Sequence, residues 1–585
     1  MRKVSDTDHV YNRLKNFSSQ RRITRVIFPL VFKPNLPVAT GSAPSPGKTT
    51  RKETLVEFEG KTIRKITVIT MDPFGFDVND SLRKPHGFLT SFGNNLHVKS
   101  LPIAIRNYLL IRRNEPFDSL LVRESERLVR KQNFIRDVAF QPVLISPDSV
   151  DIIIRVQDVW SIVPDGSFSP RSFSFRITED NFLGTGNQLK YFGDHSIKSN
   201  DRGYGLGYVI PNIDNSYITT SILYSVSPDK SYSKSIILNR TFFSPYTRWA
   251  GGILLQQQYR KDSLILTKEY RKLQIYKTNL YDYWAGTSWQ ILKGRSENER
   301  NTNLVLAGRV KQLRYPLRPD EIIDSIDTYH AVSSYLASIG INSRKYVRDK
   351  YLFRYGIPED IPIGRVYSFT LGYQIERGIK TGYAGFTSKW SDFYSFGYLG
   401  GHLEYGTFFS SSGVHEGVVL AGMTYFTNLT EVGTWKFRQF LKTEMVIGMN
   451  RTAQDKLSFN DYMGVNGFDG SLEPGTSKVH FTIQTQSYAP WNLLGFRLGP
   501  FLNCTAGMLG DNTHVFLKSR LYSYIGIGVL IKNDYLNSNY FQLSLAYYPM
   551  IPALGNNILK TNSFQPSDFR LQDFEQGKPN FVPYE

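Results

Sequence analysis

Polar and apolar positions alternate along the greater part of this chain. Phe173, Phe175 and Ile177 alternate with serine, arginine and threonine, and a turn that contains Gly184 and Gly186 follows them. A period of two is that of a β-strand with one apolar face. Similar segments recur about every two dozen residues after this point, so the pattern predicts a sheet over roughly 400 residues.

The later alternating segments predict a closed β-barrel that crosses a membrane. The clearest of them are 217–224, 249–259, 365–373, 481–488, 525–531 and 540–548. In hydrocarbon every backbone polar group must be paired, so strands cross a bilayer only as a closed barrel. The 415 residues after residue 170, at about 24–26 for each strand with its turn, predict an antiparallel barrel of about sixteen strands. A soluble propeller or a tandem of sandwiches is the alternative, but no repeat of about 40–50 residues supports it.

Residues 55–157 follow a different pattern, that of a compact mixed unit. Pro116 ends one helix, because proline cannot continue it, and Asp118 is a natural N-cap for the next. Glu126 and Arg130 are spaced to pair on that second helix. The predicted elements are a strand in 55–71, helices at 103–111 and 119–131, and strands at 135–145 and 150–157. Their order is β-α-α-β-β.

Residues 1–52 differ from both regions. Apolar residues recur at loosely helical spacing among many Lys and Arg up to residue 32, and a Pro/Gly/Ser/Thr-rich linker follows. Gly47 begins a Gly-Lys-Thr triplet like the end of a phosphate loop, but the position five residues earlier is Ser42, so this hypothesis is rejected. The sequence contains no convincing export signal. The predicted division is 1–52 (basic helix and linker), 53–164 (mixed unit) and 165–585 (barrel).

Composition narrows the choice of function. Aromatic residues make up 14% of the chain while mean hydropathy is −0.31, which suits strands that are half apolar and half wet, although Tyr-rich soluble sandwiches share this composition. The net charge of +19 is spread without a dense basic tract, which favours contact with anionic lipid over nucleic acid.

Cys504 is the single cysteine, so an internal disulfide and a multi-cysteine metal site are excluded. No G-x-S-x-G or H-E-x-x-H motif occurs, so we expect no enzyme, catalytic residue, metal or cofactor.

The junction between the two patterns resembles the BamA/TamA superfamily of outer-membrane assembly and translocation barrels. The residues that carry the resemblance are Asp180, Asn181, Gly184 and Gly186, which are similar to a D-x-N-x-x-G-x-G-like segment on the family's first barrel strand, although Asp180 and Asn181 are adjacent in this chain. The sequence DVW (158–160) resembles the exit strand of the family's periplasmic POTRA domain. The resemblance implies a mainly β protein with one POTRA-like domain in the periplasm. It also implies a barrel in the outer membrane of a Gram-negative bacterium, in contact with outer-membrane lipid and lipopolysaccharide.

A second resemblance concerns a loop that folds back into the barrel in this family. Its V-R-G-F/Y tip is similar to the stretch Gly464, Val465, Asn466, Gly467 and Phe468, with asparagine in place of the arginine. The region 501–507 lacks the carboxylate that pairs with this arginine in the family. The joint loss is physically consistent, because one buried charge without its partner costs several kcal/mol. The resemblance implies that the tip enters the lumen, with the phenylalanine filling apolar space; a surface Asn-Gly hairpin is the alternative.

The resemblance also implies a lateral seam where the first barrel strand meets the last. An incoming chain can add a strand at such an edge. We expect one lip at 173–178 and the other at 569–584, where Pro579 and Pro583 interrupt the hydrogen-bond ladder; fraying of the chain end is the alternative. In the mixed unit, the strand with Phe140 and Leu144 is a candidate docking edge, interrupted by Pro142.

The favoured function is insertion or assembly of outer-membrane proteins through this seam. Client barrel proteins and periplasmic lipoprotein subunits are the partners that the resemblance implies. The alternative is a pore of the two-partner-secretion type that passes a secreted polypeptide or stays passive.

Overall fold

The computed structural model describes residues 55–584 with internal gaps. The gaps are 81–87, 266–270, 293, 320–328, 412, 452–454, 460–466, 469–474, 494–495, 512–515, 517–518, 534, 536–540, 552–554 and 564–570. The described residues from Gly60 onward belong to one compact unit, which contains all the helices and strands named below. The predicted N-terminal helix and linker lie outside the described residues, and so do Gly464, Val465 and Asn466.

Strands make up most of the described chain, and the helices are few. The helices are α4 (Phe88–Leu96), α5 (Pro102–Arg106), α6 (Ser119–Arg130) and α7 (Glu297–Arg300). The first twelve strands are β1 (Thr62–Met71), β2 (Ile135–Ser146), β3 (Ser149–Asp158), β4 (Ile162–Phe168), β5 (Ser172–Phe182), β6 (Asn187–Ser196), β7 (Arg202–Ile210), β8 (Thr219–Val226), β9 (Tyr232–Arg240), β10 (Trp249–Ile265), β11 (Arg271–Gln290) and β12 (Thr302–Leu317). The others are β13 (Val332–Asp349), β14 (Glu359–Glu376), β15 (Ile379–Tyr394), β16 (Gly397–Ser410), β17 (Gly413–Thr427), β18 (Thr430–Val432), β19 (Trp435–Met449), β20 (Ser477–Tyr488), β21 (Asn492–Leu493), β22 (Phe496–Gly510), β23 (Leu521–Asn533), β24 (Phe541–Ile551) and β25 (Gly555–Thr561).

Strands β1–β3 and helices α4–α6 form a small domain. Its sheet has the order β1-β3-β2, with β1 parallel and β2 antiparallel to the central strand β3. Val150, Ile152, Ile154 and Val156 alternate along β3 and are all fully buried, so one face of the sheet supplies the core. The predicted β-α-α-β-β order is present, with α4 as an additional helix in the loop after β1.

Helix α6 begins where its cap predicts. The carboxylate of Asp118 accepts hydrogen bonds from the backbone N–H groups of Leu120 (2.9 Å) and Leu121 (3.2 Å). These bonds satisfy two of the donors that the first helical turn leaves without a partner.

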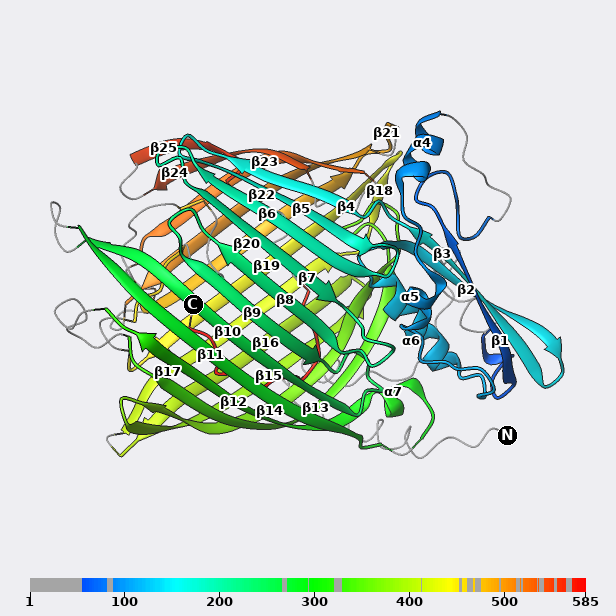
Figure 1. Cartoon of the computed structure of the whole chain (residues 1–585), viewed down its shortest axis with the longest axis horizontal. Coiled ribbons are helices and arrows are strands. Elements are labelled where there is room, and N and C mark those ends of the chain that lie inside the picture. The colour runs from blue at the N-terminus through cyan, green and yellow to red at the C-terminus, as the bar shows by residue number, and fades with distance from the viewer. Residues whose placement is uncertain are drawn as a thin grey trace, which may run out of the picture. The chain divides into compact units, whose positions relative to one another are not determined.

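Strands β4–β25 form a closed barrel in which each strand is antiparallel to the next (Figure 1). The short strand β18 extends β17, because both pair with β19, and the short strand β21 extends β20, because both pair with β22. The described ring therefore has about 20 strands. The antiparallel barrel is therefore confirmed, but the strand number exceeds the predicted sixteen. The turns are shorter than assumed: β14 and β15 are joined by Arg377 and Gly378 alone, both at positive φ, as in a two-residue hairpin turn.

The wall of the barrel is apolar outside and polar inside. On β23 and β24, Ile527 and Leu543 are more than half exposed, whereas Tyr524 and Ala546 point inward and are buried. Charged and amide side chains such as Arg438 are buried within the ring. This arrangement is the reverse of a soluble barrel and is that of a transmembrane one. None of the described helices is long and apolar enough to cross a membrane.

Candidate functional site: the occupied lumen and the domain junction

The last described residues, 571–584, run through the inside of the barrel without regular secondary structure (Figure 1). We call them the luminal segment. The prediction that 569–584 forms the last barrel strand is wrong, because the ring ends with β25. The physical reason is that Pro579 and Pro583 have no N–H to donate to a strand ladder, while the charged and amide side chains of the segment find polar partners in the lumen.

The acidic part of the luminal segment meets a buried arginine. Arg344 on β13 is 2% exposed, and its Nη1 lies 3.2 Å from Asp573 Oδ1 and 3.6 Å from Glu575 Oε2. The other oxygen of Glu575 accepts a hydrogen bond of 2.8 Å from the backbone N–H of Phe242, and Arg344 donates to the carbonyl of the same residue. Two carboxylates of the segment thus compensate one buried cation of the wall.

The basic part of the luminal segment meets a buried carboxylate. Lys578 donates to Asp282 on β11, which is 3% exposed. Arg309 on β12 donates to both oxygens of Asp282, at 2.8 and 2.7 Å, and also to the carbonyl of Pro579 at 3.0 Å. A fourth bond of Arg309 goes to the side chain of Asn580. One wall arginine therefore holds both a wall carboxylate and the backbone of the segment.

The aromatic part of the luminal segment packs on aromatic wall residues. The ring of Phe581 lies edge-on to Tyr383 with centroids 4.7 Å apart, and 5.0 Å from Phe408. The hydroxyl of Tyr383 accepts a hydrogen bond of 2.8 Å from the N–H of Val582. Such ring pairs add stability beyond the area that they bury.

Two wall glycines leave room for side chains of the luminal segment. A Cβ at Gly340 would collide with the Gln576 amide, which is oriented to donate to the carbonyl (3.2 Å) and accept from the N–H (3.1 Å) of that glycine. A Cβ at Gly448 would lie 2.6 Å from the ring of Tyr584. At Gly340 the carbonyl of Tyr367 on the neighbouring strand, also 2.4 Å from such a Cβ, requires glycine as well, whereas at Gly448 the nearest atoms belong to the segment.

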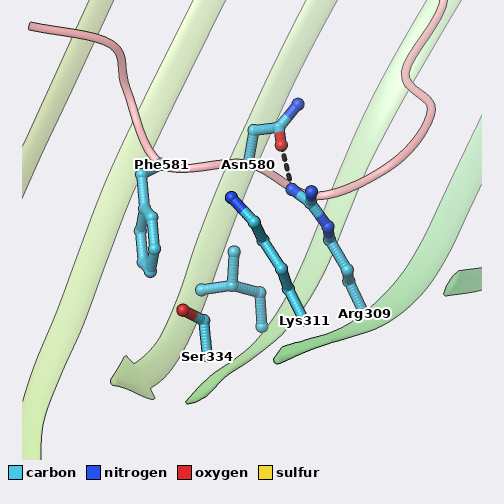
Figure 2. A pocket seen from close by; sticks show the side chains of 6 residues that line it. Arg309, Lys311, Ser334, Asn580 and Phe581 are labelled. Atoms are coloured by element: carbon cyan, nitrogen blue, oxygen red, sulfur yellow. Dashed lines mark hydrogen bonds between the residues drawn. The ribbon is translucent and has the colours of Figure 1, made fainter. Parts of the chain in front are cut away.

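A cavity of about 170 Å³ lies beside the luminal segment (Figure 2). Its lining consists of Arg309, Lys311, Ser334, Leu336, Asn580 and Phe581. In Figure 2 the basic side chains of β12 extend toward the segment, and Phe581 lies at the other side. Within the described residues, no group of three or more His, Cys, Asp or Glu side chains is placed to hold a metal ion.

Helix α6 is held on the barrel by buried ion pairs. Arg130 donates to both oxygens of Asp360 on β14, at 2.8 and 2.9 Å. The predicted pair of Glu126 and Arg130 is confirmed at 3.2 Å, and Arg348 of β13 joins it at 3.3 Å from Glu126. The network has two cations and two carboxylates, so its charges balance.

A second pair on α6 faces the connection between β9 and β10 and strand β13. Arg127 lies 2.7 Å from Glu124, donates to the carbonyl of Phe243 at 3.0 Å, and sits 3.9 Å over the ring of Tyr346. Burial alone would raise the pKa of Glu124, but the charge and hydrogen bond of Arg127 outweigh it and hold that pKa below its ordinary value. Because β13 supplies both Tyr346 and Arg344, the small domain and the luminal segment are bound to neighbouring residues of one strand.

The predicted first lip of the seam is not an edge. Phe173, Phe175 and Ile177 lie on β5, which pairs with β4 on one side and β6 on the other. The first strand is β4, which sequence reasoning missed because Pro164 and Gly166 interrupt its alternation. The corrected seam is the junction of β25 with β4, where the ring closes.

The glycine-containing turn after β5 serves a different purpose from the one predicted: it attaches the small domain to the barrel. The amide of Asn181 donates to Ser100 Oγ at 2.9 Å and accepts from the N–H of Gly186 at 2.8 Å. Ser100 in turn donates through its N–H and its hydroxyl to Asp158, each at 2.8 Å. Both Asn181 and Asp158 are almost fully buried.

Asp180 and Gly184 complete this attachment. Asp180 is 6% exposed, and its N–H donates to the carbonyl of Ser161 at 3.0 Å. The carbonyl of Gly184 accepts a 2.8 Å bond from the N–H of Leu101. Gly184 has φ +74°, and a Cβ there would lie 2.5 Å from the carbonyl oxygen of Lys99, so glycine is required both for conformation and for space.

The described part of the loop tip lies inside the barrel. Phe468 is fully buried, with its ring 5.2 Å from Tyr548 and 5.9 Å from Tyr522. The carbonyl of Gly467 accepts a 2.7 Å hydrogen bond from Lys560 Nζ on β25. The sequence analysis did not identify this lysine. Because the loop tip has asparagine where the family has arginine, a cation from another element was to be expected as its partner, and Lys560 is the one cation of β25.

The candidate docking edge of the small domain is strand β2. Phe140 is buried at 3% exposure, whereas Val143, Leu144 and Ile145 are exposed at 39%, 50% and 45%. Pro142 lies between these two parts of the strand. The apolar end of an edge strand is thus open to solvent in this chain.

Comparisons with known proteins find structural matches only. No family profile and no curated protein sequence matches the chain. CdiB from Acinetobacter baumannii matches with a TM-score of 0.39 and 11% identity, over 96% of this chain and 98% of that one. CdiB from Escherichia coli matches with 0.34 and 9%, over 96% and 98%. BamA from Haemophilus ducreyi lacking POTRA domains 1–3 matches with 0.32 and 14%, over 86% and 83%.

The TM-scores of these matches are low, so the fold is established by the strand order and pairing of this chain itself.

Proposed function

We propose that this chain is an outer-membrane barrel of the BamA/TamA type that brings polypeptides into the membrane, with its small domain on the periplasmic side. An apolar exterior around a polar lumen supports the membrane location. The proposed activity involves no covalent chemistry and no cofactor.

The observation that carries the proposal is the short seam between β25 and β4. Each of these strands is 7 residues long, whereas β11–β15 are 16–20 residues long. A strand of 7 residues can form fewer ladder hydrogen bonds than a strand of 16–20 residues, so the seam costs less to open than the junctions between the long strands. An open seam offers two strand edges, to which a client barrel adds its own strand.

Secretion through the lumen is the second candidate, and the luminal segment favours it. The segment is held by ion pairs, hydrogen bonds and ring contacts, all of which are reversible. A passage through the barrel requires its displacement.

Liposomes with purified protein separate the two candidates. In a Cys504→Ser background, paired cysteines on β4 and β25 close the seam when oxidised, and a matched pair at Leu206 and Tyr224, which face each other on β7 and β8, is the control. Seam insertion predicts that oxidation of the first pair stops the folding of a client barrel, while the control pair has no effect. Client folding that continues at full rate with the seam closed would contradict it.

The exposed end of β2 is the proposed docking site for a periplasmic lipoprotein subunit. Leu144→Asp would place a charge among the exposed apolar residues there. Recovery of the same partners by the full chain and by this variant would contradict the proposal.

A further inference from the structure

We propose that the inner wall of the barrel is a peptide-binding track, which the luminal segment occupies as a built-in ligand. An extended segment of a second polypeptide with the same order of groups, acidic, then basic, then aromatic, takes its place. This inference rests on the proposed function, in which the protein handles a second polypeptide.

The acidic subsite is a buried cation whose compensation comes from the segment. In the described part of the chain, both carboxylates that pair with Arg344 belong to residues 571–584. Arg344 is 2% exposed with the segment in place, and an empty track would leave its guanidinium with water and the carbonyl of Phe242 in place of two carboxylates. The wall is thus charge-balanced for an acidic ligand rather than for an empty lumen.

The basic and backbone subsites lie next along the wall. Asp282 receives Lys578, while Arg309 binds the carbonyl of Pro579 at 3.0 Å. A contact to a backbone carbonyl is independent of the ligand's side chain, so it tolerates different sequences at that point.

Three glycines on three strands shape the track. A Cβ at Gly406 on β16 would lie 3.0 Å from Val582, which adds a third close contact to those of Gly340 on β13 and Gly448 on β19. The three glycines lie against three different residues of the segment, so the wall fits the segment along most of its length. The neighbouring 170 Å³ cavity leaves space for a bulkier side chain near Phe581.

The luminal segment has no regular hydrogen-bond ladder, and a translocating peptide can take up a backbone of the same kind. The luminal segment has no helix or strand of its own, and its contacts are made mainly by side chains. Side-chain recognition at separated subsites allows exchange of one extended chain for another, because no sheet has to be broken.

The test compares a released with a locked segment. A variant that ends at Ser563 empties the track. In the full chain with Cys504→Ser, Gly406→Cys and Val582→Cys place two Cβ atoms about 3 Å apart, and Tyr383→Phe removes the hydroxyl that would crowd the new side chain. A shift of the segment by about 0.5 Å brings the pair to a disulfide's spacing, and oxidation then locks the segment in place. The probe is a fluorescent synthetic peptide of residues 571–585, and its binding to protein in lipid nanodiscs is measured by anisotropy.

We expect saturable binding to the shortened variant, and binding at least about 100-fold weaker for a peptide with Asp573→Lys and Glu575→Lys, because two cations then face the buried Arg344 in place of two carboxylates. We expect the full chain to bind excess peptide when reduced and not when oxidised. Folding of the shortened variant is checked by circular dichroism and by the shift of its electrophoretic mobility on heating.

Two outcomes would overturn the inference. One is a folded shortened variant that does not bind the peptide; the other is equal exclusion of the peptide by the reduced and the oxidised full chain, which defines a permanent structural plug. If the shortened variant does not fold, the comparison of peptide binding by the reduced and the oxidised full chain still tests the inference. Because the readout is peptide binding in nanodiscs, its failure is distinct from a failure of client folding in liposomes, which concerns the proposed function.

Discussion

The two sides of this barrel differ in strand length and in what they hold. Strands β11–β15 are 16–20 residues long and present Asp282, Arg309 and Arg344 to the luminal segment. On the other side β4 and β25 have 7 residues each, and most residues of both are exposed. The long side holds the luminal segment and the short side closes the ring.

The difference teaches that a closed ring of strands is not uniform in strength. The number of ladder hydrogen bonds grows with strand length, so the long side stays intact while the short side opens. A wall that stays intact can keep charged subsites in position. The proposed seam and the proposed track therefore lie on the sides of the barrel that suit them.

The largest expected effect comes from the buried arginine of the long side. Arg344→Leu leaves Asp573 and Glu575 without their partner, and we expect the free energy of unfolding in detergent to fall by about 3–5 kcal/mol. On the short side, Arg176 lies 3.9 Å from Asp165 with both side chains more than half exposed, so Arg176→Leu is expected to cost at most about 1 kcal/mol. Equal losses in urea unfolding would mean that the two sides do not differ as described.

The next effect concerns the fit between wall and luminal segment. Gly448→Ala forces a Cβ against the ring of Tyr584, and we expect a loss of about 1–3 kcal/mol in the full chain. With Tyr584→Ala in addition, most of this loss should disappear, because the contact that remains is with the flexible side chain of Arg451, whose Cγ would lie 2.8 Å from the new Cβ. Gly308→Ala is the control on the long side, because its nearest atom is 3.8 Å away. If Gly448→Ala lowers the free energy of unfolding equally with and without Tyr584→Ala, the strain does not come from contact with Tyr584.

The barrel and the small domain were predictable because their signals are local. Alternation of exposed Ile527 with buried Tyr524 is required of any strand between lipid and water, and Asp118 marks the start of α6 through its own hydrogen bonds. The strand number was too low because two-residue turns such as Arg377-Gly378 leave no polar stretch to count.

Most of the candidate site could not be predicted from the sequence, because the residues that pair in it are far apart in the chain. Asp573 meets Arg344, and Lys578 meets Asp282, across more than 200 residues, which no local pattern records. The available signal was the lack of alternation around Pro579, which argued against a barrel strand without showing where the segment goes. The turn motif at Asn181 was found, but its role in holding the small domain depends on Ser100, which carries no sequence signal.

A smaller effect tests the attachment of the small domain to the short side. Gly184→Ala adds a collision with the carbonyl of Lys99 to the strain of a positive φ, whereas Gly378→Ala has the same kind of φ and nothing within 4 Å. We expect about 1–2 kcal/mol for the strain alone and a larger loss at Gly184. The measure is the rate of proteolysis between the small domain and the barrel. Equal rates for the two variants would show that the turn does not hold the small domain.

The smallest expected effect is the pH dependence of the link between α6 and the long side. The pKa of Glu124 is held below its ordinary value, so its contribution to stability is fully present above that ordinary value and is lost as pH falls through the lower, folded one. Burial instead raises the pKa of Asp137, so folding disfavours its charged form and Asp137→Asn should stabilise the small domain at neutral pH. Thermal unfolding of the Glu124→Gln and Asp137→Asn variants at a series of pH values separates the two contributions. We expect the gain from Asp137→Asn to vanish in acid, where the carboxyl is protonated in both states. The effect of Glu124→Gln should shrink over the same acid range, and a constant effect down to the lowest pH would mean that the pair with Arg127 does not depend on the charge of Glu124.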